Sequence, residues 1–192
     1  MLILASRSPQ RRAILEQLGV RFRVEAPEVQ ELSEGAPREL AHENARRKAA
    51  AVGGQLVLGV DTLVTLEGRV FGKPADEDTA AGYLRALSGN THEVISGVVL
   101  AVGDEERSDT AVTRVRFRTL EDRLLTWYLA SGEWRERAGG YAIQGKGAAL
   151  VEYVEGDYSN VVGLPISLLV SLAPELLPLH SAAAGPGAGL SD

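Results

Sequence analysis

The chain has 192 residues, is 45% hydrophobic and 24% charged, and carries a formal net charge of −6. These values are typical of a globular domain and exclude an intrinsically disordered chain. The negative charge argues against a protein that binds duplex DNA by neutralising its phosphates, and the absence of cysteine excludes disulfides and thiolate metal sites. Because no apolar run has the length of a signal-peptide core or a membrane span, we expect a cytoplasmic protein without membrane contact.

A short apolar strand at Leu2–Ala5 is followed by a helix that we expect over residues 10–18. Ser8 is a good N-cap for this helix, and Arg11 lies in its first turn. A cation there opposes the helix dipole, whereas a bound anion would meet the dipole, free backbone N–H groups and the hydroxyl of Ser6. The alternatives are a capped helix with solvated arginines and a phosphate site, and the run of serines and arginines favours the phosphate site.

A second strand at residues 21–26 leads into an acidic loop at 27–35 and then a helix at 37–52. Glu31 in the loop either binds a divalent cation or is ordinary loop charge, and its spacing alone favours ordinary charge. Lys48 projects from the middle of the small-residue face of the helix. A lysine on a packing face must either extend to solvent or meet an anion, and we favour the anion.

The centre of the chain is an apolar strand, Leu56–Leu66, that carries one carboxylate, Asp61. Apolar residues at both alternating sets of positions predict that both faces are covered, and a buried carboxylate is costly unless it is paired, hydrogen-bonded or metal-bound. A two-residue turn then returns the chain antiparallel over residues 69–73, which brings Lys73 level with Asp61 and Thr62. These residues form either a ligand site or a buried salt bridge that locks the hairpin.

The second half of the chain alternates helices, strands and glycine-rich connections. We expect these elements at the following residues: helices at 76–87 and 121–130, strands at 91–102, 110–120 and 148–154, a glycine-bounded turn at 156–163, and a last helix that ends near 176. His92 has no histidine close to it in sequence, so we expect it to form a hydrogen bond and not to bind a metal.

The loop at residues 131–147 is rich in glycine, which permits positive φ angles and close approach of the backbone to a ligand. The side-chain amide of Gln144 both donates and accepts, so it can pair with the edge of a nucleobase. A glycine-rich surface loop is the alternative interpretation. The low-complexity composition from residue 178 predicts a single domain over residues 1–177 and a disordered tail over 178–192.

Six motifs, in this order along the chain, resemble the Maf (septum-formation-inhibitor-like) family of nucleoside triphosphate pyrophosphatases. They are Leu4-Ala-Ser-Arg-Ser-Pro-Gln-Arg-Arg12, Gly59-Val-Asp-Thr62, Gly72-Lys-Pro74, Leu87-Ser-Gly89, Ala138-Gly-Gly-Tyr-Ala-Ile-Gln-Gly145 and Asn160-Val-Val-Gly-Leu-Pro165. The fifth motif resembles the branch that acts on dTTP and UTP, with modified pyrimidine nucleotides as further candidates. Gln10 stands where the family commonly has an arginine, and this departure leaves the base preference open.

The resemblance implies an α/β fold with a mixed twisted sheet flanked by helices, elongated and two-lobed with a central cleft, and related to inosine triphosphate pyrophosphatases. It also implies that Asp61 is the general base that activates water. The phosphate-binding and catalytic positions of the family fall on Ser6, Arg11, Glu31, Lys48 and Lys73. The specificity positions fall on Gln10, Thr62 and Gln144.

The residues and the resemblance predict the same chemistry, hydrolysis of a nucleoside triphosphate to the monophosphate and pyrophosphate. Four groups would hold the triphosphate: the helix N-terminus at Ser8, Arg11, Lys48 and Lys73. We expect a divalent cation (Mg²⁺, Mn²⁺ or Co²⁺), with Glu31 and Asp61 as candidate ligands, to lower the pKa of the attacking water. The partner is the nucleotide, without stable nucleic acid, and a homodimer is left open.

Two other functions use the same groups. A nucleotidyltransferase also binds triphosphate through an arginine-rich N-terminal loop, but it transfers the α-phosphate to an acceptor and not to water. A regulatory nucleotide-binding protein of cell division would sense the nucleotide without hydrolysing it. Release of pyrophosphate separates hydrolysis from sensing, and the fate of the α-phosphate separates hydrolysis from transfer.

Overall fold

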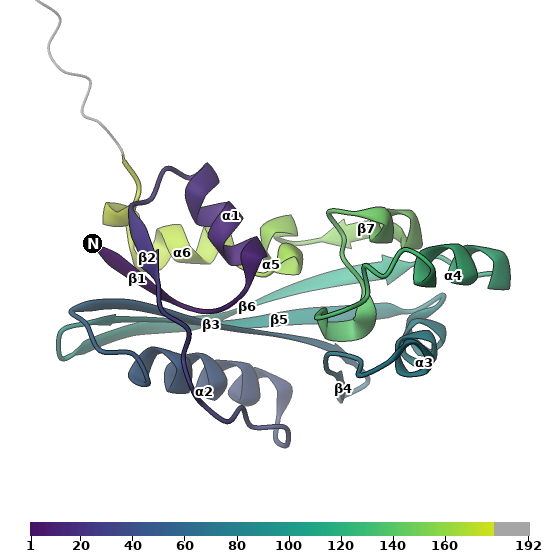
Figure 1. The fold of residues 1–192 in the computed structure, drawn as a ribbon, viewed down its shortest axis with the longest axis horizontal. Helices are drawn as coiled ribbons and strands as arrows, with labels where there is room; N and C mark the ends of the chain where they lie inside the picture. The colour runs from purple at the N-terminus through teal and green to yellow at the C-terminus, as the bar shows by residue number, and fades with distance from the viewer. Residues whose placement is uncertain (179–192) are drawn as a thin grey trace, which may run out of the picture.

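The structure, a computed structural model, describes residues 1–178 and is built on one mixed sheet of seven strands (Figure 1). The strand order is β2-β1-β3-β5-β6-β7, and β4 pairs with β3 away from this path. The strands are β1 (Leu2–Ala5), β2 (Phe22–Val24), β3 (Leu56–Leu66), β4 (Arg69–Phe71), β5 (Thr91–Val102), β6 (Glu105–Phe117) and β7 (Val151–Glu155). β1 runs parallel to β2 and β3, and the other pairings are antiparallel.

Helices cover the sheet differently at its two ends. The helices are α1 (Pro9–Gln17), α2 (Pro37–Ala50), α3 (Glu77–Leu87), α4 (Asp122–Leu129), α5 (Tyr158–Val162) and α6 (Ile166–Leu172), and the 3₁₀ turns are Ala138–Gly140, Lys146–Leu150 and Pro174–Leu176. In Figure 1, α2 lies on one face of the sheet, α1 and α6 lie on the other, and α3 and α4 lie at the far end. The mixed sheet, the flanking helices and the elongated two-lobed shape confirm the predicted fold class.

The apolar core is divided between the two ends of the sheet. At one end, β1 and the first half of β3 pack against α1 and α6 on one side and against α2 on the other. At the other end, Val64 and Phe71 pack with side chains of α3 and α4 and with Tyr141 of the glycine-rich loop. Both faces of β3 are therefore covered along most of its length, as its unbroken apolar pattern predicts.

Two glycines let α2 lie directly on the sheet. A Cβ atom at Gly59 of β3 would collide with the backbone carbonyl of Ala45, and one at Gly97 of β5 would collide with that of Ala41. Alanines on the facing side of α2 complete this close contact, and both are fully buried. The close packing brings the polar side chains of the same helix face to the middle of β3.

Four predicted elements in the second half of the chain are wrong in extent or type, and one of them is the last helix, which ends at Leu172 and not near residue 176. β6 begins at Glu105 and not at residue 110. A tight turn at Gly103 brings residues 105–109 back beside β5, and their charged side chains can remain mostly exposed while the backbone pairs. Residues 146–150 form a 3₁₀ turn before a shorter β7. The expected turn at 156–163 contains α5, whose N-terminus is capped by the carboxylate of Asp157.

Two findings concern membrane-spanning segments and the C-terminal residues. None of the helices within residues 1–178 has both the length and the apolar character that crossing a bilayer requires. From residue 179 onwards, the predicted tail lies outside the described residues.

Candidate functional site

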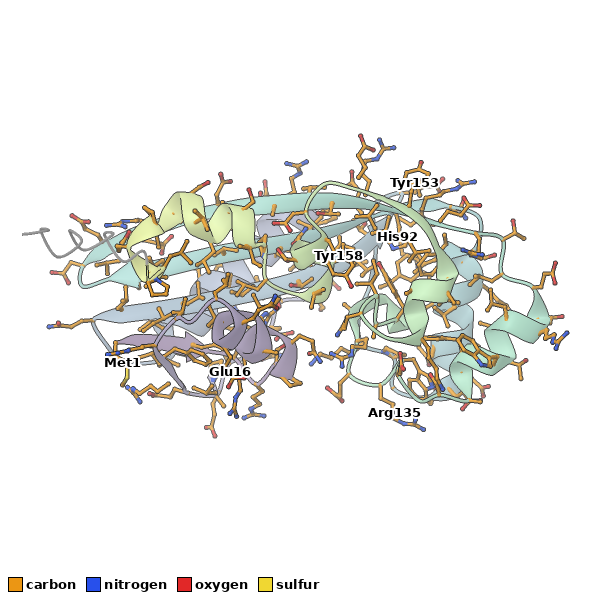
Figure 2. The ribbon with its side chains drawn as sticks, turned by 90° about the horizontal axis from the view of Figure 1, so that it is seen from above. Met1, Glu16, His92, Arg135, Tyr153 and Tyr158 are labelled. Carbon is orange, nitrogen blue, oxygen red and sulfur yellow. The ribbon has the colours of Figure 1, made fainter. Side chains whose placement is uncertain are left out.

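A cleft of about 710 Å³ opens between the two ends of the molecule. Figure 2 shows the two parts of the chain that face each other here, α1 with Glu16 on one side and the 131–147 loop with Arg135 on the other. All ten residues that the sequence singled out line this cleft: Ser6, Ser8, Gln10, Arg11, Glu31, Lys48, Asp61, Thr62, Lys73 and Gln144. The structure therefore brings together positions that are up to 138 residues apart, from Ser6 to Gln144.

The buried carboxylate of the central strand has two partners on α2. The side chain of Asp61 is 7% exposed, its Oδ1 atom accepts from Lys48 Nζ at 2.5 Å, and its Oδ2 atom accepts from Asn44 Nδ2 at 3.2 Å. The Lys48 ammonium also lies 2.6 Å from Glu31 Oε1. The prediction that this lysine meets an anion is confirmed, and two carboxylates converge on one cation.

Lys73 lies in the same cleft but does not pair with Asp61. The predicted register of the hairpin is confirmed, since Leu66 pairs with Arg69, but the pairing stops at Phe71. The carbonyl of Gly72 accepts instead from the backbone N–H of Gly139 in the glycine-rich loop, so β4 ends before Lys73. The interpretation of a salt bridge that locks the hairpin is wrong, because the cation that neutralises the buried carboxylate comes from α2.

Lys73 forms its ion pair with Glu136 of the glycine-rich loop, on its own side of the cleft. Its Nζ atom lies 3.3 Å from Glu136 Oε2, and the two side chains are 63% and 83% exposed. Glu136 adopts a φ of 58°, a left-handed conformation that is uncommon for a residue with a side chain. Both residues of this pair remain open to solvent and to an incoming ligand.

Arg11 is buried and fastens three parts of the site. Its Nε atom donates to the carbonyl of Gly163 at 2.9 Å, and its two terminal nitrogens donate to the hydroxyls of Ser6 and Thr62, each at 3.0 Å. Burial lowers the pKa of the Arg11 guanidinium, while the nearby charges of Asp61 and Glu31 act in the opposite direction. The alternative of a solvated arginine is wrong here, because the side chain is enclosed by β1, β3 and the end of α5.

The start of α1 has the predicted cap and a further polar contact. Ser8 Oγ accepts from the backbone N–H of Arg11 at 3.4 Å and donates to Gln10 Oε1 at 3.1 Å. The hydroxyl of Thr62 contacts both Arg11 and Ser96, the latter at 2.8 Å. Thr62 therefore already has protein partners, which a nucleobase would have to share.

Gln144 is exposed at the cleft in a turn that a carboxylate holds in place. Glu133 Oε2 accepts from the backbone N–H of Lys146 at 2.7 Å. A Cβ atom at Gly145 would collide with this carboxylate, so a larger residue at that position would push the Glu133 side chain away from Lys146. The backbone on the C-terminal side of Gln144 is thus fixed while its side chain is free to contact a ligand.

A buried pair, His92 and Tyr141, lies beneath the same wall of the cleft. His92 lies inside the molecule (Figure 2), and its Nε2 atom is 2.8 Å from the hydroxyl of Tyr141, which lines the cleft. Burial lowers the pKa of His92 to about 4 and raises the pKa of Tyr141. The expected hydrogen-bonding role of His92 is confirmed.

The charges around the cleft favour an anionic ligand. Five cationic side chains line it, Arg7, Arg11, Lys48, Lys73 and Arg137, against three carboxylates, Glu31, Asp61 and Glu136. The Nε atom of Arg137 is buried and has no hydrogen-bond partner in the structure, which leaves a donor unsatisfied at this surface. A positive excess inside a chain of net charge −6 is suited to a polyphosphate.

Glu31 and Asp61 are the carboxylates that could hold a divalent cation, since both lie against the ammonium of Lys48. Oxygen ligands suit Mg²⁺, which commonly binds one or two carboxylates together with substrate phosphates. Within residues 1–178, no group of three or more histidine, cysteine, aspartate or glutamate side chains is arranged to hold a metal. The donor set fits a cation that binds together with a nucleotide.

Sequence reasoning missed several residues of the site. Asn44 lies one helical turn before Lys48, so the i, i+4 spacing was a signal that it shares the packing face. Tyr141 was part of a quoted motif without an assigned role. Nothing in the local sequence indicated that Ser96 would meet Thr62 from the neighbouring strand.

Comparison with known proteins agrees with this geometry. The sequence model of one family, described as Maf-like protein, matches residues 1–176. The chain is similar to the dTTP/UTP pyrophosphatase of Symbiobacterium thermophilum, at 44% identity over 96% of this chain and 98% of the relative. It is also similar to the dTTP/UTP pyrophosphatase of Thermus thermophilus, at 47% identity over 89% of this chain and 92% of the relative.

One solved structure shows a more distant likeness. The structure of the Staphylococcus aureus Ham1 protein matches with a TM-score of 0.44 and 12% sequence identity, over 60% of this chain and 71% of that chain. At these values the likeness has no bearing on the chemistry of the cleft.

Proposed function

The chain belongs to the family of Maf-like proteins, and on that basis we propose that it hydrolyses dTTP or UTP to the nucleoside monophosphate and pyrophosphate. The observation that carries the proposal is the buried pair of Asp61 and Lys48 in a cleft whose cationic side chains outnumber its carboxylates. A carboxylate fixed in such a place can take a proton from water beside a bound polyphosphate.

Asp61 is the proposed general base. Its two oxygens are oriented by Lys48 and Asn44, so the carboxylate is held in one position before substrate binds. It would accept a proton from the water that attacks the α-phosphorus, and the bond to the bridging oxygen would then break to release pyrophosphate. A fixed carboxylate avoids the reorganisation that a flexible side chain would need in the transition state.

The cations of the cleft would hold the triphosphate. Lys48 pairs with two carboxylates before substrate arrives, and the third N–H of its ammonium can contact a phosphate oxygen at the same site. Lys73 can exchange its exposed partner Glu136 for a phosphate at little cost, because exposed ion pairs are weak. Arg11 is held in the same cleft by the hydroxyls of Ser6 and Thr62 and adds a further positive charge there.

We further propose that Glu31 and Asp61 hold a divalent cation, Mg²⁺, Mn²⁺ or Co²⁺, together with the phosphates. When bound, this ion would supply positive charge to the phosphate oxygens. The chain itself provides the two carboxylates at 2.6 Å and 2.5 Å from Lys48, and the ammonium keeps them from repelling each other while no ion is present.

The glycine-rich loop would select the base. The amide of Gln144 can donate to a carbonyl and accept from the imide N–H of thymine or uracil, and the fixed turn after it limits where the amide can reach. Cytosine presents an amino group in place of one carbonyl and would leave a polar group unpaired. Gln10, near the start of α1, lies in the same cleft and is the second candidate for base contact.

A substrate panel scored by pyrophosphate release tests the proposal. The purified chain is incubated with dTTP, UTP, CTP, dATP, GTP and 7-methyl-GTP in the presence and absence of Mg²⁺, Mn²⁺ or Co²⁺. We expect dTTP and UTP to give the highest kcat/KM. Preference for CTP or a purine nucleotide would refute the pyrimidine assignment, and release of no pyrophosphate from any nucleotide would refute the hydrolase assignment.

A further inference from the structure

The loop that carries Glu31 has few attachments to the rest of the protein. It connects β2 to α2 and runs beside α2 without helix or strand (Figure 1). Leu32, next to Glu31, is 36% exposed, so apolar burial does not hold the loop at this point. Residues 27–35 are mostly exposed or half-buried, although Pro27, Val29 and Glu31 line the cleft.

Asn44 supplies the attachment of this loop. Its Oδ1 atom accepts from the backbone N–H of Leu32 at 2.7 Å, and its Nδ2 atom donates to the carbonyl of Leu32 at 3.1 Å. This pair of bonds resembles the pairing between two strands, with a side-chain amide in place of a backbone. In the described part of the chain, residues 26–35 make no other hydrogen bond or ion pair outside the loop, apart from that of Glu31 with Lys48.

The same amide also reaches the proposed base. Nδ2 of Asn44 donates to Asp61 Oδ2 at 3.2 Å, while Lys48, one turn further along α2, binds the other oxygen. Asn44 is 1% exposed, so its position is set by the close contact between α2 and the sheet. One buried side chain therefore connects the backbone beside Glu31 to the carboxylate of Asp61.

We propose that Asn44 is a positioning residue that holds Glu31 at the distance from Asp61 at which the two carboxylates act together on a divalent cation and the triphosphate. The proposal rests on the proposed pyrophosphatase function. Without the amide, the Glu31 loop is attached only through an ion pair whose carboxylate partner is 53% exposed. Such a pair is too weak to define one loop conformation.

The first test measures the loop itself, without nucleotide or metal. In Asn44→Ala, hydrogen exchange of a peptide spanning residues 27–36 is expected to accelerate at least tenfold, whereas exchange in β3 and β5 stays unchanged. Asn44→Leu, which fills the same space without an amide, is expected to give the same result. It separates loss of the hydrogen bonds from loss of packing if the alanine variant folds poorly.

The second test measures the consequence for metal dependence. Groups that orient metal ligands typically contribute 10- to 100-fold in metal affinity, so the Mg²⁺ concentration for half-maximal pyrophosphate release should rise by about tenfold or more. Asn90→Ala is the control, because the side-chain amide of Asn90 also binds the backbone, donating to two carbonyls, but Asn90 is exposed and lies outside the cleft. It should change neither loop exchange nor Mg²⁺ dependence.

A double-mutant cycle identifies the route of the effect. If Asn44 acts through Glu31, the shift in Mg²⁺ dependence caused by Asn44→Ala should be absent in a Glu31→Ala background. Unchanged loop exchange, or an equal shift in that background, would overturn the inference. A wild-type chain that releases no pyrophosphate would instead overturn the proposed function, so the two failures are distinguishable.

Discussion

The two walls of the cleft use the same residue type in opposite ways. Lys48 on the wall formed by β3 and α2 is 9% exposed and lies 2.5 Å and 2.6 Å from two carboxylates. Lys73 on the wall formed by β4 and the glycine-rich loop is 63% exposed and lies 3.3 Å from one exposed carboxylate. One lysine is therefore part of the core, and the other is part of the surface.

This difference suggests a division of work within the cleft. Groups that must be placed accurately for attack on phosphorus lie on the buried wall, where close packing of α2 fixes them before substrate binds. Groups that add charge or contact the base lie on the exposed wall, where adjustment to the ligand costs little. The buried wall should therefore govern kcat and stability, and the exposed wall should govern KM and selectivity.

The largest effect is expected from Asp61→Asn. Removing the proposed base should lower kcat by about 10²- to 10⁴-fold, the usual contribution of general base catalysis. Binding of dTTP without added metal, measured by calorimetry, should remain within a few-fold of wild type because no phosphate donor is lost. Near-normal hydrolysis in this variant would show that the carboxylate is structural.

The two lysines should respond differently to removal. Lys48→Ala leaves a buried carboxylate without its cation, so the free energy of unfolding should fall by about 3 kcal/mol and kcat should fall with it. Lys73→Ala should change stability by less than about 1 kcal/mol and act mainly on KM. Urea unfolding and steady-state kinetics of both variants provide the comparison, and equal stability effects would contradict the division between the walls.

The buried hydrogen bond between His92 and Tyr141 lies beneath the exposed wall, and its contribution to stability should depend on pH. Its pKa is about 4 in the folded protein and 6.5 as the ordinary value, so between these pH values the unfolded chain binds a proton that the folded chain does not. The stabilising contribution of neutral His92 is present above pH 6.5 and is lost as the pH falls to about 4, by on the order of 3 kcal/mol.

The pH dependence of unfolding in wild type and His92→Asn gives the measurement. The wild-type free energy of unfolding should decline more steeply between pH 6.5 and pH 4 than that of the variant. Parallel curves would show that folding does not lower the pKa of His92.

The smallest effect is expected at Gln144. An unpaired polar edge costs roughly 1–3 kcal/mol, so Gln144→Ala should reduce the preference for dTTP over CTP by about that amount while slowing dTTP hydrolysis less. Gly145→Ala offers a second route, since its Cβ atom would push the Glu133 carboxylate away from the backbone N–H of Lys146 and so loosen the same turn. A preference that stays unchanged in both variants would place base recognition elsewhere in the cleft.

Much of this architecture follows from local sequence patterns. Long apolar runs and faces of small residues indicate burial. They therefore predict the strand at Leu56–Leu66 and the helix that carries Lys48. The same face predicted that Lys48 would meet an anion. The N-cap at Ser8 can also be predicted from the sequence, because capping depends on residues within one helical turn.

The remaining features depend on contacts between distant segments. Arg11 is enclosed partly because it donates a hydrogen bond to the carbonyl of Gly163, 152 residues later. No local sequence pattern predicts a contact over that separation. The prediction that Lys73 lies beside Asp61 extends the pairing of β3 and β4 as far as residue 73. In the structure, Gly139 of the glycine-rich loop binds the carbonyl of Gly72 and ends that pairing earlier. Asn44 could not be linked to the Glu31 loop, because Asn44 and Leu32 are 12 residues apart and meet only where the loop lies beside α2.

Hydrolysis of dTTP in water enriched in ¹⁸O tests the central claim most directly. If Asp61 activates water for attack on the α-phosphorus, mass spectrometry should find one ¹⁸O atom in the nucleoside monophosphate and none in the pyrophosphate. In Asp61→Asn, the labelled monophosphate should form more slowly, in proportion to the loss of kcat, while each molecule formed still carries one ¹⁸O atom. Label in the pyrophosphate, or products that are a nucleoside diphosphate and phosphate, would contradict the account.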